Sequence, residues 1–184
     1  MITIYLLRHA QSAPPVVNTS EVPLSEAGLE SARGIVPILS SLGIQRIVSS
    51  PYQRAVQTVI PFAKGFDIEI EIDHRLRERE MPIASESEAH MERVRDSFAD
   101  FNYAPDQSES FHEVEKRALA CLKQLAEESP VGLLLVGHGQ CLSLILRDAD
   151  NSVGFSFWKS LKTPAIVKLE MESADKPVGF QLVN

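Results

Sequence analysis

Residues 131–139 read Val-Gly-Leu-Leu-Leu-Val-Gly-His-Gly, and this stretch decides the fold class. Its apolar run predicts a strand over Val131–Val136 that is buried on both faces, as strands of parallel sheets are. Ile2–Leu7 and Arg46–Ser49 are further β-rich runs. Helical patterns alternate with these runs from end to end. The sequence therefore predicts an α/β fold with three layers (α/β/α) and a mostly parallel central sheet.

The helices are predicted from apolar periodicity and from capping residues. Ser50 is placed to cap one of them, with Pro51 as its first residue. Ser110 and Glu113 form a capping box at the start of another. The predicted helices are Ser25–Ser41, Pro51–Ala63, a segment around Glu86–Phe98, Ser110–Glu128 and Gln140–Arg147.

Three further strands are expected to complete the sheet. Asp67–Ile72 is a weaker strand pattern, which favours an edge position. Ala165–Glu170 and Val178–Val183 are predicted as closing strands. Because Pro164 and Pro177 precede them, we expect both to lie at a sheet edge.

A length of 184 residues predicts one domain over residues 1–184. Residues 75–107 are polar and interrupt the alternation, so we interpret them as a lid or insertion over one end of the sheet. Cys121 and Cys141 stand in apolar stretches and are expected to be buried free thiols. Targeting and membrane-spanning patterns are absent from the sequence, which favours a cytoplasmic protein.

The net charge of −7, from 25 acidic and 18 basic residues, argues against nucleic acid or an anionic membrane as a partner. Any anionic substrate must then bind in a local basic pocket. Nothing in the residues specifies an oligomeric state.

The chemistry-bearing residues follow the ends of the predicted strands. Arg8 and His9 end the first strand, Arg54 lies just after the second, and His138 stands between two glycines after Val136. Ligands of open α/β sheets bind beyond the carboxyl ends of strands. If these strands are parallel neighbours, two guanidiniums and two imidazoles converge at one edge.

Such a cluster favours a phosphoryl group. Arginine presents a planar fork that matches phosphate oxygens, and Arg54 lies in a first helical turn, where free N–H groups also favour an anion. Gly137 and Gly139 let the backbone approach a bound group closely. A neutral imidazole near neutral pH is a nucleophile that can form a covalent intermediate.

These segments resemble the histidine phosphatase superfamily, also called phosphoglycerate mutase-like. Its Arg-His-Gly motif compares with Arg8-His9-Ala10. Its Ser-Ser-Pro-x-x-Arg-Ala-x-Gln-Thr motif matches residues 49–58 at all seven specified positions, and its Gly-His-Gly motif matches residues 137–139. Leu24-Ser25-Glu26-Ala27-Gly28 is similar to the family's opening of the first helix.

The resemblance implies a role for each residue. His9 would become phosphohistidine, Arg8, Arg54 and His138 would hold the phosphoryl oxygens, and Gly139 would lie against the phosphate. A carboxylic acid would protonate the leaving oxygen and then activate water. Leu76-Arg77-Glu78 fits the family's Leu-x-Glu element, so Glu78 is favoured over Glu80; Glu78 could instead join a surface salt bridge with its neighbouring arginines. The resemblance implies no metal and no cofactor.

Three departures from the family pattern concern the substrate side. Ala10 replaces a glycine and would be strained at positive φ. Pro15 stands where relatives often carry asparagine, and Glu80-Met81-Pro82-Ile83 replaces a Gly-x-x-Glu-Gly stretch. The other histidines, His74, His90 and His112, have no partners at metal-ligand spacing and are expected at the surface or in caps. The aromatic residues Phe155, Phe157 and Trp158 are expected to pack in the core or in a dimer contact.

The favoured function is a metal-independent phosphatase that hydrolyses phosphomonoesters through phosphohistidine. Its substrate would be a small phosphorylated metabolite or a phosphoprotein. A phosphoglycerate-type mutase and a protein phosphohistidine phosphatase are the alternatives within the family. A non-catalytic phosphate-binding or interaction module is the alternative from another class.

Overall fold

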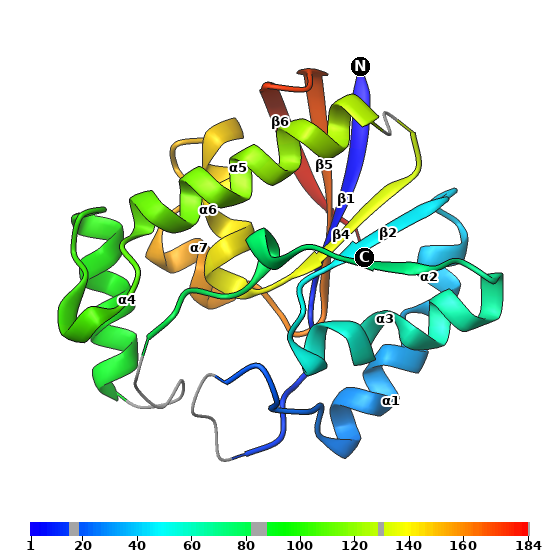
Figure 1. The fold of residues 1–184 in the computed structure, drawn as a ribbon, viewed down its shortest axis with the longest axis horizontal. Coiled ribbons are helices and arrows are strands. Elements are labelled where there is room, and N and C mark those ends of the chain that lie inside the picture. The colour runs from blue at the N-terminus through cyan, green and yellow to red at the C-terminus, as the bar shows by residue number, and fades with distance from the viewer. Residues whose placement is uncertain (15–18, 82–87, 129–130, 184) are drawn as a thin grey trace.

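The computed structural model describes residues 1–14, 19–81, 88–128 and 131–183. In these ranges one six-stranded sheet carries helices on both faces (Figure 1). The strands run in the order β3-β2-β4-β1-β5-β6 across the sheet. Their bounds are β1 Ile2–Arg8, β2 Arg46–Ser49, β3 Ile70–Ile72, β4 Leu133–Gly137, β5 Ala165–Ser173 and β6 Lys176–Val183.

The pairing pattern confirms the predicted fold class. β4 pairs in parallel with both β1 and β2, and β2 pairs in parallel with β3. β5 and β6 continue the sheet in antiparallel fashion. The expected edge position of Ala165–Glu170 was wrong, because β5 lies between β1 and β6. Pro164 precedes β5 and lies outside it, so the missing N–H interrupts no ladder.

The predicted helix over Ser25–Ser41 is two helices, α1 (Glu26–Gly34) and α2 (Val36–Ser40). The break falls at Ile35 because Pro37, which has no N–H, belongs in the first turn of a helix. Ser25 caps α1, since its Oγ accepts the Gly28 N–H at 3.0 Å.

The helix that carries Arg54 is α3, Gln53–Phe66, and its N-cap is Tyr52. The prediction of Ser50 as N-cap was therefore wrong. The Ser50 hydroxyl accepts the Tyr52 N–H at 3.2 Å and forms a hydrogen bond with His138. This serine therefore joins the carboxyl ends of β2 and β4 in place of capping the helix.

The other predicted helices are present, whereas the short helix over Phe155–Ser160 was not predicted. The capping box is present: Ser110 N–H donates to Glu113 Oε2 at 2.7 Å, and Glu113 N–H donates to Ser110 Oγ at 3.2 Å. The bounds are α4 Glu88–Ala99, α5 Phe111–Glu128, α6 Gly139–Ala149 and α7 Phe155–Ser160, with 3₁₀ turns η1 at His74–Leu76 and η2 at Pro105–Gln107. Within the described ranges, no helix is both long enough and apolar enough to cross a membrane.

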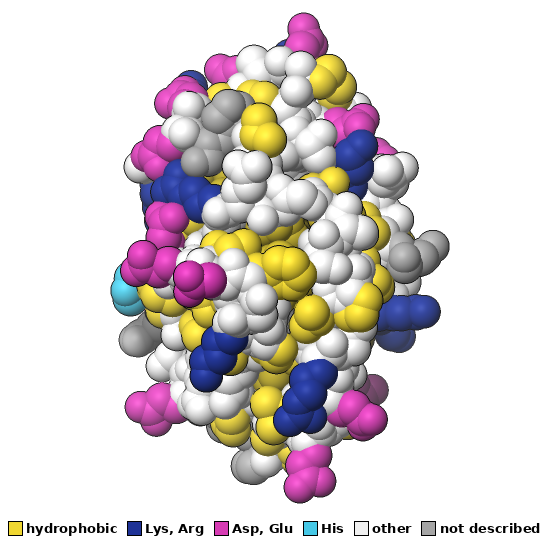
Figure 2. Space-filling model, turned by 90° about the vertical axis from the view of Figure 1, so that its right-hand side faces the viewer, with side chains coloured by type: hydrophobic (Ala, Val, Ile, Leu, Met, Phe, Trp, Pro, Cys, Tyr) yellow, Lys and Arg dark blue, Asp and Glu magenta, His cyan; other side chains and the backbone are white. Residues whose placement is uncertain are grey.

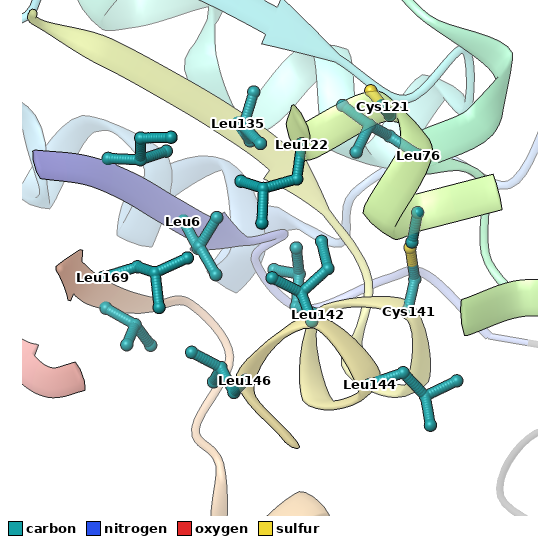
Figure 3. Close-up of a cluster of buried hydrophobic side chains, with 14 of the residues drawn as sticks. Leu6, Leu76, Cys121, Leu122, Leu135, Cys141, Leu142, Leu144, Leu146 and Leu169 are labelled. Carbon is teal, nitrogen blue, oxygen red and sulfur yellow. The ribbon is translucent and has the colours of Figure 1, made fainter. Parts of the chain in front are cut away.

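Alternate residues of the strands enter two apolar clusters, one on each face of the sheet. Leu6 and Leu135 pack with α5 and α6, whereas Leu7 and Val136 pack with α3 on the other face. Figure 3 shows the first cluster, in which Leu122, Leu142 and Leu146 meet side chains of the sheet. Each fully buried leucine contributes roughly 1.5–3 kcal/mol, so β1 and β4 are fixed firmly.

The two cysteines lie in the same cluster, as predicted. Cys121 and Cys141 are buried free thiols (Figure 3). Burial raises the pKa of Cys141 to about 12, so this thiol stays protonated and serves as a small apolar side chain.

Candidate active site

The carboxyl ends of β1, β2 and β4 meet at one edge of the sheet, because these strands are adjacent and parallel. A cavity of about 640 Å³ opens there. Arg8, His9, Arg54 and Glu78 line it together. Four of the residues selected from the sequence are thus brought to one surface.

His9 is held in a single tautomer. Its Nδ1–H donates to the Ala10 carbonyl at 2.7 Å, since a carbonyl can only accept. The Arg54 Nε–H approaches His9 Nε2 at 3.4 Å, so Nε2 is the unprotonated acceptor. Burial, aided by the charges of Arg54 and Arg8, lowers the pKa of His9 to about 3. The ring is therefore neutral at physiological pH, with the Nε2 lone pair on the guanidinium side.

The two arginines reach the cavity from different elements. Arg54, only 3% exposed, lies in the first turn of α3; its Nη1–H donates to the Thr19 carbonyl at 3.0 Å. Arg8 ends β1 and donates from Nη1 to the Leu161 carbonyl. The Arg8 Nε is buried and has no hydrogen-bond partner among the described residues. Both guanidiniums are permanent cations and can share the charge of a phosphoryl group.

His138 lies beneath the cavity and does not line it. The ring is fully buried, 5.0 Å from the His9 ring between centroids, and its Nε2 is 2.7 Å from Ser50 Oγ. In the described part of the chain its Nδ1 has no hydrogen-bond partner. Burial and the nearby Arg54 hold the pKa of His138 well below its usual value. The residue is a neutral imidazole adjacent to the candidate nucleophile.

Gly139 begins α6 at a point of close approach. A Cβ at this position would lie 2.8 Å from Trp158 Nε1 and 3.1 Å from Arg8 Cζ. Those distances are too short for a side chain, so glycine is required for the indole and the guanidinium to occupy this space.

Glu78 and Glu80, the two candidate acids, have different surroundings. Glu78 is 8% exposed and lines the cavity. Its carboxylate accepts the N–H groups of Arg79 and Gln140 at 3.0 Å and that of Cys141 at 3.1 Å. The last two belong to the first turn of α6, so Glu78 also caps that helix.

The side chain of Glu80 is 62% exposed, pairs with Arg77 at 3.2 Å, and is absent from the cavity lining. The arginines around Glu78 are occupied elsewhere: Arg75 pairs with Asp73 and Arg77 also pairs with Glu109. Among the described residues, Glu78 has no ion-pair partner within 4.0 Å. The surface salt-bridge interpretation of Glu78 is thus contradicted by its position.

Ala10 fits its position without strain. The described non-glycine residues with positive φ are Asp67, Asp106 and Gln107, and Ala10 is not among them. Its N–H donates to Thr58 Oγ1 at 2.9 Å, and the Thr58 hydroxyl donates to the Arg54 carbonyl at 2.7 Å. Of the other two departures, Pro15 and the second half of the Glu80–Ile83 stretch, Pro82 and Ile83, lie outside the described residues.

The individual residues on the opposite side of the cavity were not predicted from the sequence, although α4 belongs to the segment interpreted as a lid, residues 75–107. It is lined by His90 and Met91 of α4 and by residues 158–163, which include Trp158. His90 is 4% exposed, so the expectation of a surface or capping histidine was wrong for it; His74 and His112 are exposed as expected. His90, Val94 and Ser97 are the buried residues of α4, and their i, i+4, i+7 spacing was a usable signal.

Trp158 joins the core cluster, as expected, and also lines the cavity. The part of the chain that the structure describes contains no group of three or more His, Cys, Asp or Glu side chains arranged to hold a metal ion.

Comparison with known proteins gives one family. The profile of the histidine phosphatase superfamily (branch 1) matches residues 4–178. The probable phosphoglycerate mutase GpmB of Proteus mirabilis is 31% identical over 160 residues, which cover 79% of this chain and 74% of that protein.

Solved structures share the fold. A mycobacterial glucosyl-3-phosphoglycerate phosphatase in complex with VO3 superposes with a TM-score of 0.81 at 18% identity, over 100% of this chain and 98% of that one. A mutant phosphoserine phosphatase of Entamoeba histolytica in complex with phosphoserine gives 0.76 at 16% identity, over 100% and 96% of the two chains.

Proposed function

This chain belongs to the histidine phosphatase superfamily, and from that premise we propose that it hydrolyses phosphomonoesters through a phosphohistidine on His9. The observation that carries the proposal is the state of His9. Its Nδ1 proton is committed to the Ala10 carbonyl, and its Nε2 lone pair is beside Arg54. A neutral nucleophile next to a cation suits attack on an anionic phosphoryl group.

In the first step, His9 Nε2 attacks phosphorus and the bond from phosphorus to the ester oxygen breaks. Arg8 and Arg54 hold the phosphoryl oxygens, and the buried ring of His138 packs against His9 and helps to position the nucleophile. The two guanidiniums stabilise the charge on the oxygens of the transition state, where most catalysis of phosphoryl transfer arises. Glu78 donates its proton to the leaving oxygen, so the product departs as an alcohol.

In the second step, the Glu78 carboxylate accepts a proton from a water molecule, whose oxygen attacks phosphorus. The nitrogen–phosphorus bond breaks, inorganic phosphate forms, and His9 returns to its neutral state. The position of Glu78 at the cavity and the distance of Glu80 from it support the choice of acid. The arginines supply the charge that a metal would otherwise provide, so the proposed reaction needs none.

The proposed substrate is a small phosphorylated metabolite. Within the predicted lid, residues 75–107, we propose that α4 covers the site, because it contributes His90 and Met91 to the cavity lining. A mutase is the second candidate, because curated relatives are named probable phosphoglycerate mutases. The two reactions share the first step and differ in whether water or a substrate hydroxyl receives the phosphoryl group.

The experiment is hydrolysis of p-nitrophenyl phosphate with a chelator present, for the wild type and His9→Ala. We expect the wild type to turn over and His9→Ala to lose at least about 10³-fold in kcat, as enzymes do when a covalent nucleophile is removed. An inactive wild type that still binds phosphate would favour a binding module. Transfer of phosphate to an added phosphoglycerate at a rate above hydrolysis would favour the mutase.

A further inference from the structure

We propose that the outer half of the cavity is a second anion site, formed by Lys159 and Lys162. It selects phosphomonoesters whose leaving group carries another negative charge, as a carboxylate or a second phosphate. This inference rests on the proposed function, since it assumes that the phosphoryl group lies between Arg8 and Arg54 and that the leaving group points outward.

The charges of the cavity lining suggest this site. Among the described residues that line the cavity, four are basic, Arg8, Arg54, Lys159 and Lys162, and one is a carboxylate, Glu78. The whole chain, in contrast, has a net charge of −7. On the face of the molecule that Figure 2 shows, basic side chains are scattered and acidic ones lie mostly near the margin, so basic residues are not gathered there. The cavity departs from that distribution. Two arginines suffice for a phosphoryl dianion, which leaves two lysines for a further anion.

Both lysines are free to serve this role. In the described part of the chain, neither Lys159 nor Lys162 has an acidic partner within 4.0 Å, although lysines 123, 168 and 176 do. Both are exposed at the rim. An ammonium group is a point charge on a flexible stem. It therefore selects a ligand by its charge more than by its shape and can bind either a carboxylate or a phosphate.

The segment that carries the lysines is fixed to the phosphoryl side of the cavity. Trp158 and Leu161 are buried, and they alternate with the two exposed lysines. The Leu161 carbonyl accepts a hydrogen bond from Arg8, and Trp158 Nε1 shares with Arg8 the space above Gly139. Because Arg8 binds the Leu161 carbonyl and shares the space above Gly139 with Trp158, the segment that carries the lysines has a defined place relative to the phosphoryl site.

The cavity also has room for the substrate. Its volume of about 640 Å³ exceeds what a phosphate group fills and lies within the roughly 300–1,000 Å³ of small-molecule sites. The Trp158 indole N–H is buried and has no hydrogen-bond partner among the described residues. The Trp158 side chain lines the cavity beside the Arg8 guanidinium.

The test compares three esters of one propyl skeleton: propyl phosphate, the phosphate ester of 3-hydroxypropionate, and propane-1,3-diol bisphosphate. The measured quantity is kcat/KM for each charged ester divided by that for propyl phosphate. We expect a wild-type ratio of about tenfold or more for at least one charged ester, as a hydrogen bond to a charged group provides. The two charged esters show which anion the site prefers.

Lys159→Gln and Lys162→Gln each remove one positive charge from the site. We expect each to lower the ratio several-fold, mainly through KM, and Lys162→Glu to lower it further. Lys64→Gln is the matched control, because Lys64 is exposed on α3, away from the cavity. It removes the same charge and should keep the wild-type ratio.

Equal kcat/KM for the three esters, or an unchanged ratio in both lysine variants, would overturn the second anion site. Failure of the proposed function is a different result, in which the wild type hydrolyses none of these esters or p-nitrophenyl phosphate. In that case, calorimetric binding of the same three compounds to His9→Gln tests whether the second anion site exists. If His9→Gln binds a charged ester more tightly than propyl phosphate, and the double variant His9→Gln/Lys162→Gln does not, the second anion site is supported. Equal affinities for the three compounds in His9→Gln contradict it.

Discussion

At the scale of single residues, two hydrogen bonds determine what His9 can do. The Ala10 carbonyl takes the Nδ1 proton and Arg54 is on the Nε2 side, so the imidazole needs no base to become a nucleophile. Glu78 combines two roles in one position. Its carboxylate lines the cavity, and it accepts the N–H groups of Gln140 and Cys141 at the start of α6.

Glu78→Gln separates these two roles. If Glu78 protonates the leaving oxygen, the variant should lose about 10²–10⁴-fold in kcat with an alkyl phosphate, whose leaving group needs a proton. The loss with p-nitrophenyl phosphate should be much smaller, because nitrophenolate leaves unprotonated. The measurement is the ratio of the two losses. Equal losses with both esters, together with a lower melting temperature, would assign Glu78 to capping alone.

At the scale of elements, local sequence signals determined most boundaries. The β2 strand has the predicted bounds, and the α5 capping box forms between Ser110 and Glu113. Where prediction failed, a neighbouring group changed the outcome. Pro37 divided one helix into two, and Ser50 turned to His138, which left the first turn of α3 without a side-chain cap.

The capping box gives a prediction at this scale. Ser110→Ala removes the acceptor of the Glu113 N–H and one donor to the Glu113 carboxylate. We expect a loss of about 0.5–2 kcal/mol in the free energy of unfolding, the usual cost of losing a cap. Denaturant unfolding measures it, with Ser40→Ala on the exposed end of α2 as control. A loss no greater than that of the control would mean that packing of α5 alone fixes its start.

At the scale of the whole molecule, buried neutral histidines couple stability to pH. The pKa of His9 falls from an ordinary 6.5 to about 3 on folding, through burial and the charge of Arg54, and that of His138 is also lowered. Between these values the unfolded chain binds more protons than the folded one. Stability is therefore full above about pH 6.5 and is lost as the pH falls toward 3.

The expected slope is up to about 1.4 kcal/mol per pH unit for each such histidine. Urea unfolding of the wild type and His9→Gln between pH 7 and 5, in a buffer without phosphate, measures it. The free energy of unfolding of the variant should fall less steeply with falling pH, by up to the roughly 1.4 kcal/mol per pH unit that one bound proton contributes. Parallel curves for the two proteins would show that His9 is protonated as readily in the folded state as in the unfolded one.

The sequence allowed the sheet and the phosphoryl side of the cavity to be predicted, because Arg8, His9 and Arg54 follow strand ends within local motifs. The substrate side could not be predicted in the same way. Trp158, Lys159 and Lys162 reach the cavity through long-range contacts, the Arg8 bond to Leu161 and the packing above Gly139. His90 depends on which face α4 turns inward, and its helical spacing with Val94 and Ser97 carried that information.

The central claim is that the phosphoryl group passes through His9, and trapping the intermediate tests it most directly. The wild type is mixed with ³²P-labelled phosphomonoester and quenched in base within one turnover, since a nitrogen–phosphorus bond survives base and breaks in acid. We predict protein-bound label on the peptide that contains His9, released by mild acid and absent in His9→Gln. Label on another residue, or hydrolysis without any protein-bound phosphorus, would contradict the account.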